Sequence, residues 1–509
     1  MKVQLLVILS LLSADLFSQE NKSADSVFFY DQRQRHLEFS KQNATLLLKN
    51  TENQIGKVSL IYDYASGNLR NSQMPLSSSN IQFSSDGIRK LGRLKLYGDF
   101  TYSRIKDHGL GNSLRGEEID DQPFYYLAEK ESDVQRQKYH AKGIISYELI
   151  RDKIYLSSGF NYVYYLADRS IDPRMSLKWF DFIVKPELTW VNKHFHLGLS
   201  GLWGYGTENT TIKYKNKDYS NGSAYPDRIT YLNYGYGYTR KAFDNFSRRK
   251  QYKGFGMHLA TTLDSWNTLL NLDYKVSEDA NGKSLDASLK DEIFSTYQSD
   301  QLEGQLLLTK QKGHRIQQIE AAYSTLIGED YFNALAAKNY TAKNRMTYLS
   351  YSNLKTKGNH SFEWGVHTRY LSAYKKDAIT SHLFEYSYVQ PGLKAGYYQA
   401  NPGKYRFSAI VSPSLVLPLQ TTSNVATTQV TEFTTTVTYP DYAFRKITSG
   451  RVDLKLQYVS QTFSKDFRTG VTLNAGISKA LDKPNIEYPS KFLPGDQRFF
   501  MNLSLNLYF

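Results

Sequence analysis

The stretch "FFMNLSLNLYF" (Phe499–Phe509) decides the fold, because large apolar side chains occupy every second position up to the last residue. The apolar series is Phe499, Met501, Leu503, Leu505, Leu507 and Phe509. The mostly polar series between them is Phe500, Asn502, Ser504, Asn506 and Tyr508. A period of two places the two series on opposite faces of a β-strand. We therefore expect a strand with a continuous apolar face, ending inside the folded structure instead of in a frayed polar tail.

The first 18 residues, "MKVQLLVILSLLSADLFS", have the three-part layout of a secretory signal peptide. A Lys lies beside the initiator, an apolar run extends through Leu12, and small residues lead to Ser18. This apolar run is too short to span a bilayer. We expect residues 1–18 to be removed and Gln19 to begin the mature chain. The chain contains no cysteine, which excludes disulfides, thiolate metal sites and a lipid-anchored N-terminal Cys.

The mean hydropathy of −0.52 is typical of a soluble protein, and no window after residue 18 offers the roughly 18 apolar residues of a membrane helix. A β-barrel resolves this conflict, since only every second residue of each strand must face lipid. The 41 tyrosines and 27 phenylalanines suit the aromatic girdles of such a barrel. A soluble β-sandwich also shows alternation. Its strands are shorter, and the signal peptide and terminal aromatic strand favour the membrane.

Short and long connections alternate along the chain, as in an outer-membrane barrel with tight periplasmic turns and long outer loops. Gly, Asn, Asp and Pro predict tight turns at 151–152, 192–193, 265–266, 312–313, 357–358, 401–403 and 464–465. Long polar loops are predicted at 106–137, 167–178, 207–250, 278–299, 328–343, 375–383, 420–449 and 480–495. Upstream strands at 56–64, 80–85 and 93–105 continue the rhythm, with a tight link at "DGIRKLG" (86–92). The count is about 18 strands, with about 16 as the alternative if the first pair is discounted.

The alternation of side chains within individual strands shows which face is polar. Val452, Leu454, Leu456 and Tyr458 alternate with Asp453, Lys455 and Gln457. The same alternation of outward apolar residues recurs at 405–415 and 471–477. The fold class predicted is all-β, a transmembrane antiparallel up-and-down β-barrel formed by residues 56–509. Its last strand would be recognised by the barrel assembly machinery and would close against the first strand, which removes the unpaired edge.

Residues 19–55 precede the first predicted strand and contain a short apolar run, Leu46–Leu48. This segment could fold back as a small plug in the lumen or pack beneath the barrel as a periplasmic arm. A poorly ordered leader is the structural alternative. A barrel of about 18 strands is wide enough to leave an aqueous lumen that needs filling or gating.

Several stretches resemble an uncharacterised family of Bacteroidota outer-membrane β-barrel proteins, a domain-of-unknown-function family. They are "LYGDFTYSRIKD" (96–107), "ADRSIDPRMSLKWFDFIVKPELTW" (167–190), with its Asp-Pro-Arg loop, and the closing "FMNLSLNLYF". The resemblance implies one large barrel over nearly the whole mature chain and assigns no catalytic residue. Members of the family are associated with TonB-dependent uptake machinery. This sequence shows no TonB-type plug domain.

Two sequence stretches are candidates for metal binding. His194 and His196 in "NKHFHLG" are predicted to share a lumenal strand face, but a zinc site needs a third ligand and none is near in sequence. "RGEEIDDQPF" (115–124) places four carboxylates in an outer loop. They could bind calcium or bridge lipopolysaccharide through divalent ions. The spacing matches no calcium loop, so ordinary polar residues are the favoured interpretation of both stretches.

Two further stretches lie in the longest predicted loop. "YLNYGYGYTR" (231–240) could stack Tyr rings on sugars, although an extension of a strand or an aromatic belt is favoured. "RKAFDNFSRRK" (240–250) is basic and could attract lipopolysaccharide phosphates or anionic solutes. The formal net charge is +14. A basic lumen would favour anions, but basic outer loops give the same sum.

The function predicted is an integral component of the Gram-negative outer membrane that passes solutes between the exterior and the periplasm. The alternative is an accessory barrel that scaffolds a surface lipoprotein or receptor, and a barrel-embedded hydrolase is less favoured. HExxH, GxSxG and phosphate-loop motifs are absent from the sequence. We expect no enzyme activity, no catalytic, metal or cofactor-binding residue, and no nucleic-acid partner. The expected partners are outer-membrane lipid, lipopolysaccharide and the assembly machinery.

The predicted topology can be tested by inserting epitope tags. Tags near Asn221 or Asn424 should be labelled on intact cells, because both positions lie in predicted outer loops. Tags at Lys312 or Asn401 should be labelled only after the outer membrane is permeabilised. Labelling of the tags at Lys312 or Asn401 on intact cells would show that the topology is the reverse of the predicted one.

Overall fold

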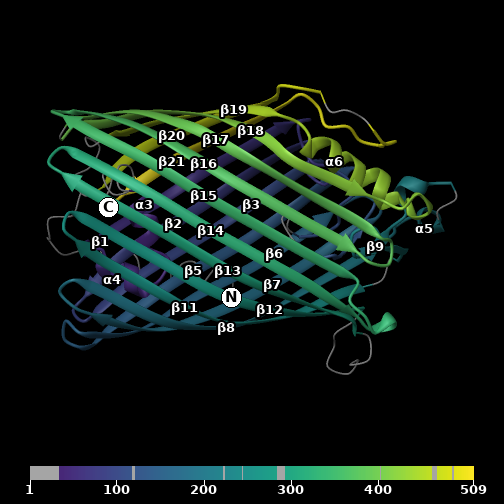
Figure 1. Ribbon diagram of the computed structural model, residues 1–509, viewed down its shortest axis with the longest axis horizontal. Coiled ribbons are helices and arrows are strands. Elements are labelled where there is room, and N and C mark those ends of the chain that lie inside the picture. The colour runs from purple at the N-terminus through teal and green to yellow at the C-terminus, as the bar shows by residue number, and fades with distance from the viewer. Residues whose placement is uncertain are drawn as a thin grey trace.

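The chain forms a closed antiparallel β-barrel, shown in the computed structural model of Figure 1. The structure describes residues 34–116, 121–221, 224–242, 245–283, 293–401, 403–460, 467–483 and 487–509. Within these ranges one 18-stranded sheet makes up the wall. The strands of the wall are steeply tilted relative to the long axis of the barrel. Tight turns join them at one end, and longer connections join them at the other (Figure 1). We call these the turn end and the loop end.

The strands of the wall are β1 (Gln54–Gly67), β2 (Ser77–Leu91), β3 (Leu94–Leu110), β5 (Ser132–Ile150), β6 (Ile154–Arg169), β7 (Arg174–Val191), β8 (Phe195–Lys213), β11 (Asn245–Leu263), β12 (Trp266–Gly282), β13 (Ile293–Lys312), β14 (Arg315–Phe332), β15 (Tyr340–Lys357), β16 (His360–Asp377), β17 (His382–Asn401), β18 (Tyr405–Asn424), β19 (Ser449–Ser460), β20 (Arg468–Ala480) and β21 (Gln497–Tyr508). Neighbours in this series pair with each other, and β1 pairs with β21. The predicted fold class and the count of about 18 strands are confirmed, and the first pair, β1 and β2, is present.

The two faces of the wall separate as the alternation predicts. Leu503, Leu505 and Leu507 of β21 are exposed on the outside, as are Val452, Leu454 and Tyr458 of β19. Ser504 and Asn506 face the interior, where the Ser59 hydroxyl donates to Asn506 Oδ1 at 2.7 Å. Aromatic rings contact one another on the outer face, for example Tyr102 and Tyr139, with centroids 4.9 Å apart. The exterior is therefore an apolar belt with aromatic clusters.

The tight turns lie where the sequence predicts them. The gaps between strands at 151–153, 192–194, 264–265, 313–314 and 358–359 agree with the predicted turns to within one residue. Pro402 and residues 464–465 lie outside the described residues. The predicted link "DGIRKLG" is wrong, because β2 continues through Leu91 and the turn is confined to 92–93. Ile88 is buried on the inward face of this part of β2, so the strand continues to pack against the interior.

The strands also extend farther into the predicted outer loops than expected. The predicted loop 207–250 contains the end of β8 and the start of β11. These two strands already pair here, beginning with Thr211 opposite Asn245. Charged inward residues explain the error. Glu208 and Arg248 look like loop residues in the sequence, but they form a buried ion pair inside the wall.

The remaining described elements lie inside or above the barrel. They are α3 (Gln34–Ser40), α4 (Ala44–Lys49), α5 (Asp218–Asn221), α6 (Tyr439–Arg445), the 3₁₀ helices η2 (Pro226–Arg228), η4 (Asn333–Leu335) and η5 (Thr427–Gln429), the π-helix η6 (Thr434–Thr438), and the strands β4 (Phe124–Leu127), β9 (Tyr231–Tyr234) and β10 (Thr239–Lys241). β4, β9 and β10 form a separate small sheet at the loop end. No helix in the described ranges combines the length and the apolar character needed to cross a membrane.

The largest apolar core lies inside the barrel at the loop end. Phe124, Leu232 and Phe433 from the long connections pack there against inward residues of the wall such as Tyr165 and Tyr297. We call the described residues of 111–131, 214–242 and 425–448 the loop cap. The loop cap fills the mouth of the barrel as a folded layer.

The barrel closes where the chain's last residue meets β1. The Gly56 N–H donates to the Phe509 carbonyl at 2.8 Å, and the Phe509 N–H donates to the Gly56 carbonyl at 3.1 Å. A Cβ on Gly56 would lie 2.0 Å from the Phe509 ring. Glycine at position 56 therefore leaves the space in which the terminal ring is seated.

Substitution Gly56→Val should displace the Phe509 ring and weaken closure by about 1–3 kcal/mol, the usual cost of overpacking. The measurement is the temperature at which the folded band is lost in heat-modifiability gels. Gly98→Val is the matched control, because a Cβ at Gly98 meets nothing within 4 Å. In a Phe509→Ala background, Gly56→Val should cost little more. An undiminished cost there would contradict the assigned contact.

Candidate functional site

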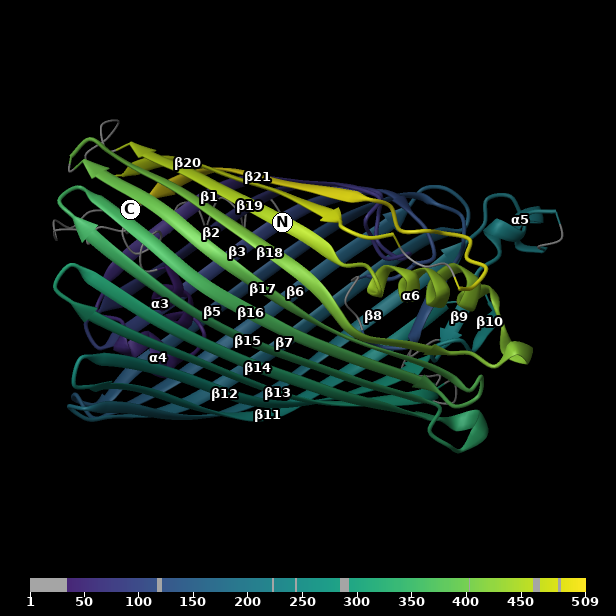
Figure 2. The same ribbon diagram turned by 45° about the horizontal axis from the view of Figure 1, so that its top comes forward.

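Two short helices occupy the lumen at the turn end. α3 and α4 lie inside the wall near the C-terminus of the chain in Figure 2. We call residues 34–50 the helical plug. The plug is fixed to the wall both by polar contacts and by apolar packing, so the candidate site is built from these two kinds of contact.

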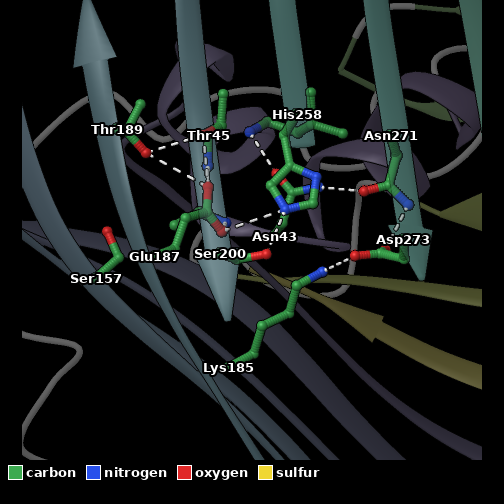
Figure 3. A network of polar contacts seen from close by, with 12 residues as sticks. Asn43, Thr45, Ser157, Lys185, Glu187, Thr189, Ser200, His258, Asn271 and Asp273 are labelled. Carbon is green, nitrogen blue, oxygen red and sulfur yellow. Dashed lines mark hydrogen bonds and ion pairs between the residues drawn. The ribbon is translucent and has the colours of Figure 1, made fainter. Parts of the chain in front are cut away.

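The N-terminus of α4 binds a carboxylate of the wall. Glu187 of β7 accepts hydrogen bonds from the N–H groups of Ala44 (3.1 Å) and Thr45 (2.8 Å) and from the Thr45 hydroxyl (2.5 Å). These N–H groups are among those that a helix leaves unpaired at its first turn, and the helix dipole favours an anion there. Glu187 is 4% exposed. Figure 3 shows its carboxylate directed at Thr45.

Asn43 completes the start of α4. Its Oδ1 accepts from the Leu46 N–H at 2.9 Å, which makes it the N-cap residue. Its Nδ2 donates to Asn271 Oδ1 of β12 at 2.8 Å. One side chain thus caps the helix and ties it to the wall, as Figure 3 shows.

Gly198 of β8 makes this close approach geometrically feasible. A Cβ at position 198 would lie 1.8 Å from Thr45 Oγ1 and 2.7 Å from Glu187 Oε1. Any side chain there would push α4 off the carboxylate. Glu187 and Gly198 are not among the residues predicted from the sequence, since neither belongs to a motif that a single sequence reveals.

Further polar contacts hold the other parts of the plug. Arg35 of α3 donates from Nε to Glu320 Oε2 of β14 at 2.8 Å. Lys41 forms an ion pair with Asp86 of β2, and Lys95 of β3 donates to the Asn50 carbonyl. These contacts distribute the attachment of the plug over widely spaced strands.

Apolar residues of the plug pack against apolar residues on the inward face of the wall. Leu37 and Leu47 pack with Ile88 and Ile144, while Phe39 and Leu46 pack with Leu269 and Leu307. The sequence carries a signal for this packing. Consecutive apolar pairs such as "II" (144–145) and "LL" (269–270) break the alternation near the tight turns, which indicates strands buried on both faces.

Ser200, His258 and Glu187 come together from distant strands, but they do not form a catalytic triad. The Ser200 hydroxyl lies 3.0 Å from His258 Nε2, and Glu187 Oε2 lies 3.9 Å from the same nitrogen. A triad places the nucleophile and the acid on opposite ring nitrogens. His258 is 0% exposed and lies beneath the plug (Figure 3). The arrangement therefore anchors the plug and offers no access to a substrate.

The Tyr-rich stretch 231–240 folds into the loop cap. The N–H groups of Tyr236 and Tyr238 both donate to Asp377 Oδ2 at 2.8 Å. A Cβ at Gly235 would lie 2.2 Å from that carboxylate oxygen, and one at Gly237 would lie 2.0 Å from His382 Nδ1. The Gly-Tyr alternation thus allows the backbone to wrap around a carboxylate of the wall. The buried Tyr236 ring is not available to stack on a sugar.

The basic stretch 240–250 is also mainly structural in its described part. The Arg248 guanidinium is 1% exposed and donates to Glu208 Oε2 (2.9 Å), Asn281 Oδ1 (3.0 Å) and the Phe124 carbonyl (2.7 Å). It therefore joins the wall to β4 of the loop cap. Residues 243–244 lie outside the described residues.

The carboxylate of Asp441 ties the loop cap to the connection after β1. Asp441 of α6 accepts hydrogen bonds from the Ser72 N–H (2.9 Å) and the Ser72 hydroxyl (3.0 Å). Burial raises the pKa of Asp441 above its usual value, although the Ser72 hydrogen bonds and the nearby Arg445 lower it. The connection after β1 is thereby tied to the long connection after β18.

Neither of the two metal-binding candidates predicted from the sequence forms a metal site in the described residues. His194 is exposed in the turn after β7, because β8 begins at Phe195, and only His196 lies on the lumenal face. Four residues of the acidic stretch, 117–120, lie outside the described residues. In the part of the chain that the structure describes, no cluster of three or more His, Asp or Glu side chains could hold a metal ion.

A cavity of about 410 Å³ lies along the wall where β18–β21 meet β1 and β2. Its polar lining includes Asp63, Arg451, Asp453, Lys455 and Asn502. A smaller cavity of about 90 Å³, which Arg35 of the plug lines, shares Ile410 and Lys455 with it. We call the first the lumenal cavity and the second the side cavity. The plug therefore leaves space along one part of the wall.

A closed barrel with an apolar exterior, polar cavities and a filled lumen defines a β-barrel of the outer-membrane type. The chain belongs to a family of unknown function (DUF6850), whose model matches residues 44–509. The predicted membership of a domain-of-unknown-function family is thereby confirmed over most of the chain. A comparison with curated proteins gave no match.

Solved structures with similar barrels include transporters. The copper transporter OprC is 8% identical with a TM-score of 0.42, over 90% of this chain and 80% of that chain. The FrpB iron transporter from Neisseria meningitidis (F3-3 variant) is 9% identical with a TM-score of 0.40, over 92% and 83%. The ferric citrate transporter FecA is 8% identical with a TM-score of 0.40, over 89% and 78%. At these identities and scores, the similarities say nothing of what this chain carries.

Substitution Glu187→Gln should loosen the start of α4, because the amide cannot accept all the hydrogen bonds that the carboxylate accepts. Leaving buried donors unpaired costs about 1–3 kcal/mol. Amide exchange at residues 43–49 should therefore accelerate at least roughly tenfold, measured by hydrogen–deuterium exchange. Glu329→Gln, at a half-exposed ion pair with Lys338, is the control. Unchanged exchange at 43–49 would show that Glu187 does not anchor the plug.

Proposed function

We propose that this protein is an outer-membrane channel or transport component for solutes, with a lumen held closed at rest by the helical plug and the loop cap. The observation that carries the proposal is the space left beside the plug, where the lumenal and side cavities share Ile410 and Lys455 and have charged and amide side chains in their linings. A wall built only for support would not need a hydrated interior.

The plug has the properties of a gate. Part of its attachment to the wall consists of hydrogen bonds and ion pairs, such as those of Glu187 and Arg35, which can exchange with water when the plug moves. It fills only part of the turn-end lumen, because the side cavity lies between α3 and the wall. A modest displacement would therefore widen an existing path.

The proposed location is the Gram-negative outer membrane, with the turn end in the periplasm. The apolar exterior requires a lipid environment, because exposed leucines and aromatic residues continue around the barrel. Lipid and lipopolysaccharide are the proposed partners of this surface. The assembly machinery is the proposed partner of β21.

A second candidate function is an accessory barrel that scaffolds a surface lipoprotein or receptor. The loop cap favours it, because its folded layer closes the mouth with a packed apolar core. Such a cap offers a stable outer face, whereas an open pore would offer flexible loops. No catalytic role is proposed, since the buried Ser200–His258 contact lacks access to a substrate.

Substitution Gly198→Val should open the turn end of the channel, because its side chain would collide with Thr45 and displace α4. A loss of about 2 kcal/mol of anchoring raises the displaced population roughly 30-fold. The measurement is the open probability of the purified protein in planar bilayers. Gly98→Val is the control, because a Cβ there meets nothing within 4 Å.

A correctly folded Gly198→Val barrel that stays silent, also when Arg248→Gln is added to loosen the loop cap, would contradict the channel. If a partner protein also co-purifies from native membranes, the scaffold becomes the supported function. Folding of the variant is checked by heat modifiability.

A further inference from the structure

One row of polar side chains crosses four adjacent strands on the inward face of the wall. Asp63 of β1 lies opposite Asn502 of β21. Asn502 in turn lies opposite Asn474 of β20, which lies opposite Lys455 of β19. All four residues line the lumenal cavity, and we call them the polar ladder. The ladder has a carboxylate at one end, two amides in the middle and an ammonium group at the other end.

Hydrogen bonds run along the ladder towards its carboxylate. Asn474 Nδ2 donates to Asn502 Oδ1 at 2.9 Å, and Asn502 Nδ2 donates to Asp63 Oδ1 at 2.5 Å. Asn80 of β2 donates to the other carboxylate oxygen of Asp63 at 3.0 Å. Each amide nitrogen carries a second N–H, and each oxygen has a second lone pair. The ladder therefore keeps donors and acceptors for a solute that lies beside it.

The charges that line the lumenal cavity are balanced in sign. They belong to two acidic and two basic residues, Asp63, Asp453, Arg451 and Lys455. Arg451 and Asp453 neutralise each other through two hydrogen bonds of 2.7 and 2.8 Å. Asp63 is bonded to amides, which satisfy its oxygen atoms without neutralising its charge. Lys455 forms no hydrogen bond or ion pair within the described ranges. One charge of each sign is therefore left for a solute, at opposite ends of the ladder.

Small side chains beside the ladder leave room for such a solute. In the neighbouring row towards the loop end, Ala65 of β1 and Gly476 of β20 lie on either side of Phe500 of β21. All three residues line the cavity. The solute can therefore lie against a shallow part of the wall, with an aromatic ring beside it.

The length of the ladder sets the length of the solute. Adjacent strands lie about 4.8 Å apart, so the three intervals from β1 to β19 separate the two charged ends by about 14 Å. A hydrogen bond at each end takes up about 3 Å. An extended peptide measures about 3.5 Å per residue. A chain of two or three amino-acid residues therefore matches the space between the charged ends.

We propose that the solute of this channel is a short peptide with free ends, bound along the polar ladder with its ammonium group at Asp63 and its carboxylate at Lys455. This inference rests on the proposed channel function and deepens it by naming the class of solute. The peptide groups between the two ends pair with the amides of Asn502 and Asn474, which have the same kinds of donor and acceptor. A simple anion or a simple cation satisfies only one end of the ladder.

The absence of cysteine from the chain allows occupancy of the cavity to be measured by thiol protection. Ser412 lines the lumenal cavity and lies opposite Asp453, outside the ladder. The purified variant Ser412→Cys is treated with the neutral reagent methyl methanethiosulfonate in rising concentrations of trialanine, which should slow the reaction. N-acetyltrialanine lacks the ammonium group, and trialanine amide lacks the carboxylate. Each should need an at least roughly tenfold higher concentration for the same protection.

Two neutral variants assign each charge of the ladder to one end of the peptide. With Asp63→Asn, trialanine and N-acetyltrialanine should protect equally, while trialanine amide still protects less than trialanine. With Lys455→Gln, trialanine and its amide should protect equally, while N-acetyltrialanine still protects less. A merely structural effect of either substitution would weaken protection by all three peptides alike. Lys193→Gln, at an exposed turn, is the control and should leave all three concentrations unchanged.

The comparison of the three peptides needs no change at Asp63 or Lys455, so it stands even if those variants do not fold. Equal protection by all three peptides, or protection by none of them, would overturn the proposal. Discrimination that survives the substitution at its assigned residue would also overturn it. A thiol at position 412 that stays unreactive, also when Gly198→Val is added, would show that the cavity is closed to solutes and would have the same consequence.

The conductance of Gly198→Val distinguishes this inference from the proposed function. A conducting variant in which trialanine leaves the reactivity of the thiol unchanged would overturn the inference and leave the channel in place. A barrel that stays silent but shows charge-specific protection of the thiol would overturn the channel and leave a peptide-binding cavity.

Discussion

The pairing of β1 with β21 is the constraint on which the rest of the structure depends. A sheet in lipid cannot leave an unpaired edge, because no water is present to satisfy its N–H and C=O groups. Closure fixes the strand number and the alternation of faces. It also creates an interior that must be filled with side chains, chain segments or water. The reciprocal hydrogen bonds of Gly56 and Phe509 extend this pairing to the last residue.

The interior is filled differently at its two ends. At the loop end, long connections bring their own apolar side chains and form a packed core with the wall. At the turn end, two short helices are bound largely by carboxylates and amides of the wall, with smaller apolar clusters beside them. Polar anchors can exchange for water more readily than a large apolar core can be exposed. The plug is therefore the obstruction that the proposed channel would displace.

Between these obstructions the electrostatic character of the lumen is uneven. Most charges are compensated locally, as Arg451 with Asp453 and Lys394 with Glu363 are. The wall of β18–β20 and β1 carries several inward basic residues near the turns. The overall charge of +14 did not reveal this location. Only the register, which places Lys57, Arg406, Lys455 and Arg468 on one face, shows that part of it lies in the lumen.

Period-2 alternation and turn residues are local properties of the chain, so the amino-acid sequence alone predicted the barrel, a count of about 18 strands and most of the tight turns. It misplaced "DGIRKLG" and the loop-end limits of the strands, because inward residues such as Ile88 and Glu208 take their character from what packs inside. The anchoring of α4 was decided by tertiary structure alone. Glu187, Gly198 and Thr45 lie far apart in the chain, and only the closed wall brings a carboxylate and a side-chain-free position to the same helix end.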